Sequence, residues 1–237
     1  MNSRVVGLIA VCLASLAVST PGADAPDQTG LYLIGDIGPS FVNNVTFDRI
    51  LGVNTSASPA VEINPGVRGT VGVGYNFIPT LGAEAELGFS YNESKTYSGI
   101  VGGVPLNGAI HLWTVPLTVG LTWRPTIPPP PKPTEVETEL SLTKFFQRSR
   151  PYVGGGLGAA EVFADFDTPT TTNNNQGSGR DTVLTYYFKA GLRFPLNDRT
   201  ELGVQYRFSG DTGFTIKQTK SEEIFAHTVS VALRIQF

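Results

Sequence analysis

The sequence predicts an all-β fold, a closed eight-stranded antiparallel transmembrane β-barrel with an up-and-down meander. Three observations support this prediction. Apolar and polar residues alternate along eight segments, short turns alternate with long polar connections, and charged residues are scarce. Charged residues make up 16% of the 237 residues, which include 27 glycines and 17 prolines, and this composition disfavours a helical bundle.

The amino terminus has the pattern of a secretion signal. Arg4 precedes an apolar run over 5–18, which is too short for a permanent membrane helix but has the length of a signal-peptide core. We therefore expect a signal peptide over 1–25 and one β-barrel domain over 26–237.

The cleavage position has two candidates. Cleavage after Ala25 fits the small-x-small pattern but leaves Pro26 next to the cut, and cleavage after Ser19 competes with it. The single cysteine, Cys12, lies in the leader, so the mature chain has no disulfide, thiolate metal site or cysteine nucleophile. The net charge of -3 provides no basic field, which excludes nucleic acid as a partner.

The alternation defines the strands and their order. It is clean in six segments, weaker in 31–42, and obscured by glycine in 151–163, where the faces cannot be assigned. Most segments reach the roughly 9 to 11 residues that a tilted strand needs to cross a bilayer. The eight predicted strands cover 31–42, 66–77, 81–92, 109–124, 151–163, 182–194, 200–209 and 225–237.

The connections alternate in length. The turns 78–80 and 195–199 are short, as periplasmic turns of membrane barrels are, and four polar connections are long, as outer loops are. The long ones cover 43–65, 93–108, 164–181 and 210–224. Within them, 170–179 is polar and predicts weakly ordered chain without a deep binding site.

One connection breaks this rule. The segment 125–150 is long, yet the strand count places it on the periplasmic side. Four consecutive prolines, Pro128 to Pro131, favour an extended polyproline helix, and Thr134 with Glu137 resembles a capping box. We interpret this Pro-rich connection as a spacer, with a docking motif as the alternative.

Alternation alone fits both a membrane barrel and a soluble ligand-binding barrel, because the two differ in which face points out. Charges in mid-strand on the polar face and a final aromatic, Phe237, favour the membrane barrel. So do aromatics near strand ends, where an interfacial girdle would lie. These aromatics are Tyr75, Phe77, Phe89, Tyr91, Trp113, Trp123, Tyr152, Phe194 and Phe208.

The last strand carries the most specific motif. Val229, Val231, Leu233, Ile235 and Phe237 alternate back from the terminal aromatic. This pattern, together with Pro151-Tyr152-Val153-Gly154-Gly155-Gly156-Leu157-Gly158, resembles bacterial outer-membrane β-barrel proteins of the small, eight-stranded porin-like or opacity-protein type, over about residues 30 to 237.

The resemblance implies a monomer in the bacterial cell outer membrane, in contact with its lipid. It also implies that the barrel-assembly machinery recognises the five alternating residues, and that the outer loops carry any ligand specificity.

The polar face of the predicted strands carries charges of both signs. Because an eight-stranded barrel is only wide enough for side chains to fill, we expect an ion-pair network that plugs the lumen, with an open channel as the alternative. The predicted members are Asp36, Arg68, Glu84, Glu86, Arg124, Lys189, Arg193, Glu201, Arg207 and Arg234.

No catalytic, cofactor or metal site is predicted. His111 and His227 share the lipid-facing parity on strands that lie across the barrel from each other. Gly154-x-Gly156-x-x-Ala159 resembles a dinucleotide fingerprint, but no helical pattern follows it. We therefore expect a non-enzyme with a structural or surface-interaction role. The alternatives are a narrow diffusion pore and a lipid-modifying enzyme.

Overall fold

Eight long strands form the wall of the molecule. The computed structural model describes residues 29–50, 53–54, 60–95, 97–101, 104–125, 149–167, 177–216 and 219–237. The wall strands are β1 (Gly30–Val42), β5 (Gly66–Ile78), β6 (Leu81–Glu93), β8 (Val104–Trp123), β9 (Arg150–Asp167), β10 (Gly177–Pro195), β11 (Thr200–Asp211) and β14 (Ile224–Gln236). No helix in these ranges is long and apolar enough to cross a membrane.

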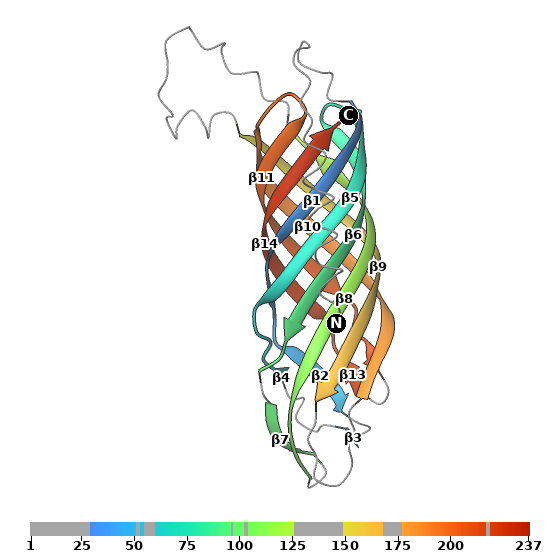
Figure 1. Cartoon of the computed structure of the whole chain (residues 1–237). Helices are drawn as coiled ribbons and strands as arrows, with labels where there is room; N and C mark the ends of the chain where they lie inside the picture. Colours follow the sequence, from blue (N-terminus) through green and yellow to red (C-terminus); the bar gives the residue numbers. More distant parts are fainter. Residues whose placement is uncertain are drawn as a thin grey trace, which may run out of the picture.

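Every wall strand pairs antiparallel with the next one along the chain, from β1 through β14. The last strand, β14, then pairs with β1, so the sheet closes on itself. Figure 1 shows the resulting wall of tilted strands. The predicted closed eight-stranded meander is therefore confirmed.

The two ends of the barrel differ. One end carries the turn at Pro79 and Thr80, the turn over 196–199, and Phe237; we call it the turn end. The other end carries six short strands, and we call it the loop end. These strands are β2 (Val45–Ile50), β3 (Val53–Asn54), β4 (Ala60–Val61), β7 (Tyr97–Val101), β12 (Thr215–Ile216) and β13 (Thr219–Ser221).

The short strands correct the expectation that the outer connections are loops. β13 pairs with β2, so the first and last long connections share one sheet at the loop end. The wall strands β8, β9 and β10 also extend into the predicted loops, and 177–179 belongs to β10. Four of the six short strands have only two or three residues, which is too few to show a period in the sequence.

Several sequence-based assignments lie outside the described residues and stay predictions. They are the signal peptide over 1–25, the part of the Pro-rich connection over 126–148, and the polar run over 170–176.

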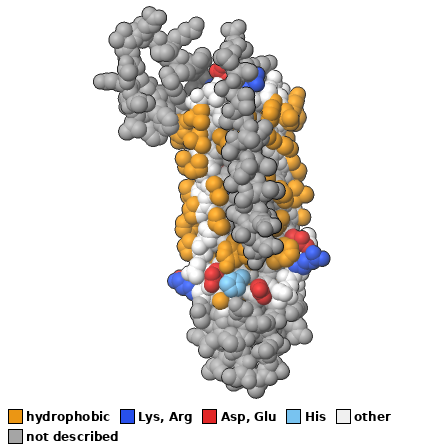
Figure 2. All heavy atoms as spheres, viewed as in Figure 1, with side chains coloured by type: hydrophobic (Ala, Val, Ile, Leu, Met, Phe, Trp, Pro, Cys, Tyr) orange, Lys and Arg blue, Asp and Glu red, His pale blue; other side chains and the backbone are white. Residues whose placement is uncertain are grey.

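The outer face of the wall is apolar. Side chains at alternate positions of each strand are exposed there, among them Val71, Leu117, Phe188 and Val204. In the view of Figure 2, hydrophobic side chains lie along the length of the wall, charged side chains lie near both of its ends, and a histidine lies toward the loop end. This is the surface that a barrel presents to lipid.

Tyr152 is an exception to the predicted girdle of aromatics. The sequence analysis counted it among the aromatics of an interfacial girdle without assigning the faces of its strand, and the structure shows that it points into the barrel and is buried. Tyr152 shares its parity with Gly154 and Gly156, whereas Val153 and Leu157, of the opposite parity, are exposed. The glycines carry no hydropathy signal, so the orientation of this strand could not be assigned from its pattern.

Glycines on the inner face make room for aromatic rings. A Cβ atom on Gly74 would lie 2.2 Å from the ring of Tyr32, and one on Gly156 would lie 2.8 Å from the ring of Tyr187. Real Cβ atoms do not approach so closely. The glycine-rich start of β9 is therefore a smooth patch of inner wall, against which Tyr187 packs.

Candidate functional site

The barrel interior is the candidate functional site, and its middle holds a buried carboxylate pair. Glu84 and Glu86 lie two residues apart on β6, so both point inward. Lys189 on β10 donates hydrogen bonds to both carboxylates, with 2.6 Å between its Nζ and Glu86 Oε1. Arg207 on β11 donates to the other oxygen of Glu86, and Arg193 Nη2 lies 3.9 Å from Glu84 Oε1. The geometry is that of a dry ion-pair network that joins three strands.

Tyrosines that the sequence analysis did not include complete this network. Tyr32 Oη donates to Glu84 Oε1 at 2.9 Å, and Tyr187 Oη donates to Glu86 Oε1 at 3.4 Å. The guanidinium of Arg207 stacks on the ring of Tyr187, 3.9 Å from its centroid. The signal for Tyr32 and Tyr187 was their parity, which matches that of Asp36 and Lys189 on the same strands.

A second group of charges lies at the turn end. Glu201 on β11 accepts from Arg234 Nη1 at 3.1 Å and from Arg150 Nη1 at 2.9 Å. Arg234 also donates to Gln236. Arg150 was not predicted, because it sits at the boundary of the Pro-rich connection rather than inside an alternating segment.

Three predicted members of the network stand apart from these ion pairs. Asp36 Oδ1, Arg68 Nε and both terminal nitrogens of Arg124 are buried without a hydrogen-bond partner. Within the described residues, no salt bridge reaches Asp36, Arg68 or Arg124. The structure thus places all ten predicted residues on the inner face, and brings seven of them into ion pairs.

An apolar core fills the lumen at the loop end, where the sequence analysis expected none. Phe214 and Ile216 reach it from the β12 region, and Val183 reaches it from β10. The rest comes from β8, β9, β14 and the first long connection: Val45, Val61, Ile63, Ile110, Leu112, Ala160, Val162, Ala164 and Ile224. We call these twelve residues the apolar cap.

Hydrogen bonds anchor the apolar cap to the wall. The Thr215 N–H donates to Asp181 Oδ2 on β10 at 2.7 Å, and the Phe214 N–H donates to Ser221 Oγ at 3.0 Å. The Glu222 N–H donates to the Thr46 carbonyl at 2.9 Å. The segment that carries Phe214 and Ile216 is therefore bonded to the wall strand β10, and the residue after β13 is bonded to β2.

The histidines lie on the outside of the wall, near the loop end. Tyr91 and His111 share a hydrogen bond of 3.0 Å between Oη and Nδ1, and Tyr206 and His227 share one of 2.7 Å. Thr228, next to His227, is buried on the inner face. The two histidines belong to β8 and β14, which are opposite in the ring of strands.

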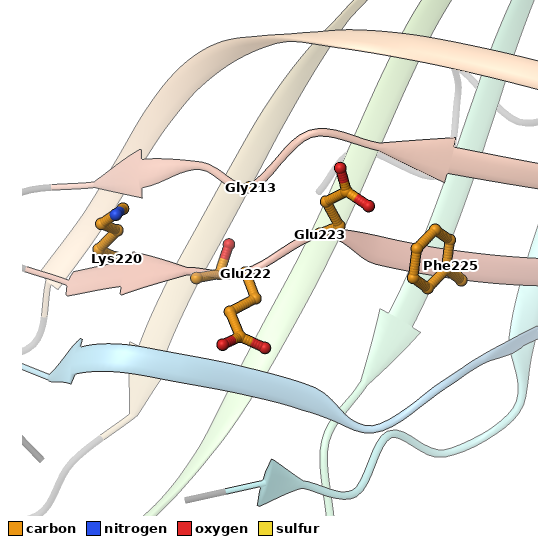
Figure 3. A pocket seen from close by; sticks show the side chains of 6 residues that line it. Gly213, Lys220, Glu222, Glu223 and Phe225 are labelled. Atoms are coloured by element: carbon orange, nitrogen blue, oxygen red, sulfur yellow. The ribbon is translucent and has the colours of Figure 1, made fainter. Parts of the chain in front are cut away.

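A shallow hollow of about 520 Å³ opens at the loop end. It is lined by Gly213, Lys220, Ser221, Glu222, Glu223 and Phe225. Figure 3 shows that the carboxylates of Glu222 and Glu223 point in different directions, so they do not form a pair. Among the described residues, no group of three or more His, Cys, Asp or Glu side chains is placed to hold a metal ion.

The five alternating residues of the last strand all face outward. Val229, Val231 and Phe237 are exposed, and Leu233 and Ile235 are partly exposed. Their strand, β14, pairs with β1 on one side and β11 on the other.

Comparison with known proteins identifies the family. The family model described as "Outer membrane protein beta-barrel domain" matches residues 10–237. The chain belongs to this family. It is a β-barrel protein of the bacterial outer membrane. No curated protein matches the sequence.

Three solved structures of outer-membrane proteins are similar to this family member. Neisserial surface protein A is 14% identical, with 88% of this chain and 98% of that chain covered and a TM-score of 0.48. The outer membrane protein OprG from Pseudomonas aeruginosa is 13% identical, with 91% and 100% covered and a TM-score of 0.47. The outer membrane protease OmpT from Escherichia coli is 9% identical, with 92% and 100% covered and a TM-score of 0.50. At these identities the likeness concerns the barrel fold and not a role.

Proposed function

We propose that the protein is a closed outer-membrane barrel with a structural or surface-interaction role, and that its loop end faces the outside of the cell. The observation that carries this proposal is that two separate layers of side chains fill the lumen at different heights. The ion-pair network fills the middle, and the apolar cap fills the loop end.

The charged groups of the network are buried and bonded to each other, which supports a plugged lumen in this layer. Arg207 has 1% of its surface exposed, and Glu86 and Lys189 are nearly as buried. Their charged groups are bound to each other, so an ion that passed between them would have to replace these bonds. Such replacement is costly, because a buried charge that loses its partner keeps its desolvation penalty.

The apolar cap is a second barrier in series with the network. Phe214 and Ile216 are almost fully buried in it, together with aliphatic side chains of four wall strands. An ion crossing this layer would lose its hydration shell without gaining polar partners, which costs many kcal/mol. A narrow diffusion pore requires both barriers to open.

The loop end has the structure expected of a surface for interaction. Its short strands pair with each other across the mouth, through β2, β13 and β12, rather than forming separate loops. The exposed side chains of Lys220, Glu222 and Glu223 lie on this part of the surface. We propose that any binding specificity resides there and in the adjoining connections.

Planar-bilayer recording tests the closed lumen directly. We expect the purified protein to insert without producing stable unit steps of conductance. Regular steps from the unmodified protein would refute the closed barrel and favour the diffusion pore. A mass shift in purified lipopolysaccharide on overexpression would instead indicate a lipid-modifying enzyme.

Thiol labelling tests the cap in the same protein. The chain's one cysteine, Cys12, lies in the predicted leader, so a single engineered thiol reports on its own site. Thr185→Cys places a thiol on the inner face beneath the cap, and Thr215→Cys places one on the exposed side of β12. In lipid vesicles, a water-soluble thiol reagent should modify Thr215→Cys rapidly and Thr185→Cys slowly. Adding Phe214→Ala should speed the labelling of Thr185→Cys and leave that of Thr215→Cys unchanged. Equal labelling rates of the two cysteine variants with Phe214 intact would contradict the proposal.

A further inference from the structure

The turn end of the lumen carries more positive than negative charge. Arg124, Arg150, Arg193 and Arg234 point into it, and Glu201 is the carboxylate among them. Both oxygens of Glu201 are already used, one by Arg150 and the other by Arg234. Arg193 also lies 3.9 Å from Glu84, but that carboxylate is bonded to Lys189, so the arginines at this end outnumber the carboxylates available to them.

Arg124 is the residue for which this imbalance is largest. It follows the last residue of β8, with its N–H bonded to the Thr80 carbonyl in the neighbouring turn. The residue is only 6% exposed, and neither Nη1 nor Nη2 has a hydrogen-bond partner. Arg234 and Arg193 repel it, and Glu201, the carboxylate that attracts it, is already hydrogen-bonded to Arg150 and Arg234. A buried charge in this position destabilises the barrel unless an anion joins it.

The neighbouring guanidinium groups are held in fixed orientations. Arg193 stacks on Tyr152 at 3.9 Å, and Arg234 stacks on Tyr32 at 4.1 Å. Stacking occupies a face of each group and leaves its edge, which carries the N–H donors, for other partners. Arg193 Nη1 and Arg234 Nε are buried donors without a partner. Three arginines thus present unused donors at the same end of the lumen.

We propose that the turn end of the lumen binds a small inorganic oxyanion of the phosphate or sulfate class, with Arg124 as its principal ligand and Arg193 and Arg234 as further donors. The guanidinium fork matches the spacing of two oxygens on such an anion, which a single-atom halide cannot reproduce. Water would satisfy the donors but would not offset the charge. This site is separate from the loop end, and it does not depend on the proposed surface role.

Arg150 marks the route by which the anion enters. Its side chain is 43% exposed, whereas those of Arg193 and Arg234 are 5% exposed. An anion that approaches from the turn end therefore meets Arg150 first and then the buried arginines. With the loop end outside the cell, this approach is from the periplasm.

The experiment measures unfolding by urea of the full barrel in lipid vesicles, in sodium phosphate or sulfate and in sodium chloride of equal ionic strength. The wild-type midpoint should rise in phosphate and in sulfate relative to chloride. Arg124→Gln should reduce the rise to the general stabilising effect that excluded phosphate and sulfate have on a folded protein, which Arg199→Gln shares, and should weaken phosphate binding by about tenfold or more. Arg199→Gln is the matched control, because Arg199 lies exposed on the 196–199 turn at the same end.

The proposal also predicts a reversal that a merely structural arginine would not produce. In chloride, Arg124→Gln should be more stable than wild type, since it removes an unpaired buried charge; in saturating phosphate, this advantage should vanish. Equal wild-type midpoints in the three salts would overturn the site. So would a loss of stability of Arg124→Gln in chloride, including failure to fold, or an effect of Arg199→Gln as large as that of Arg124→Gln.

Discussion

Removing one carboxylate from the middle of the lumen should expose the energetics of the whole network. In Glu86→Gln, Lys189 keeps Glu84 as an anionic partner, whereas Arg207 loses the carboxylate to which it is hydrogen-bonded. Arg207 retains only a bond of 3.3 Å to Thr70 Oγ1, its stacking on Tyr187, and the nearby charge of Asp36. The cost of the substitution therefore falls on Arg207.

The expected loss of folding stability follows from the partners that Arg207 keeps and loses. Breaking a buried ion pair costs roughly 3 to 5 kcal/mol, and we expect about 3 kcal/mol here because Asp36 still offsets part of the charge. The double variant Glu86→Gln/Arg207→Met removes both charges and fills similar space. It should recover about 2 kcal/mol, within the range of coupling energies measured between residues in contact.

Urea titrations of folding in lipid vesicles measure the four stabilities of this cycle. Glu86→Gln/Arg193→Met is the matched control, because Arg193 forms its ion pair with Glu84. It should show no recovery. If the changes in unfolding free energy of Glu86→Gln and Arg207→Met simply add, the two residues are not energetically coupled. That result would refute an ion-pair network that plugs the lumen.

Three further predictions concern the wall and its ends. Leu117→Arg, at an outward mid-strand position that is 62% exposed, should lower the folding stability in lipid by roughly 2 to 4 kcal/mol. Phe41→Arg, near the loop end, should lower it by at most about 1 kcal/mol. Equal losses in vesicle titrations would contradict the assignment of this face to lipid. Deleting Phe237 should lower the amount of inserted barrel and leave precursor in the periplasm, and fractionation that finds equal insertion would refute its role in assembly. A membrane-impermeant thiol reagent on intact cells should label Glu222→Cys and not Asp198→Cys, and the opposite result would invert the barrel.

The wall could be predicted from sequence because lipid and lumen impose opposite chemistry on alternate residues. Segments such as 66–77 and 200–209 carry that contrast at nearly every position, so their presence, order and faces could be assigned. The strand ends could not. Beyond the membrane the contrast disappears, while backbone pairing continues, as in β8 from Val104 and β9 to Asp167.

The partners inside the lumen could not be predicted either. Alternation shows that Glu84 and Lys189 point inward. It contains no information on which inward residues meet across the barrel, and these two lie 105 positions apart in the chain. Tyr152 shows a related limit, because its glycine neighbours give no hydropathy signal. The apolar cap was missed since its members are single residues such as Phe214, scattered through connections with no period.

The pairing of β1 with β14 determines when the barrel can close. Seven of the eight wall contacts join strands that follow each other, and each can form as a local hairpin. The eighth joins Tyr32 in the first wall strand to Gln236 in the last, which is made after the other seven wall strands. Until then, two rows of backbone amides and carbonyls have no strand to pair with, and in lipid each unsatisfied group costs several kcal/mol. A chain that lacks its last strand is therefore not a smaller barrel with one strand fewer, but an open sheet that the bilayer rejects.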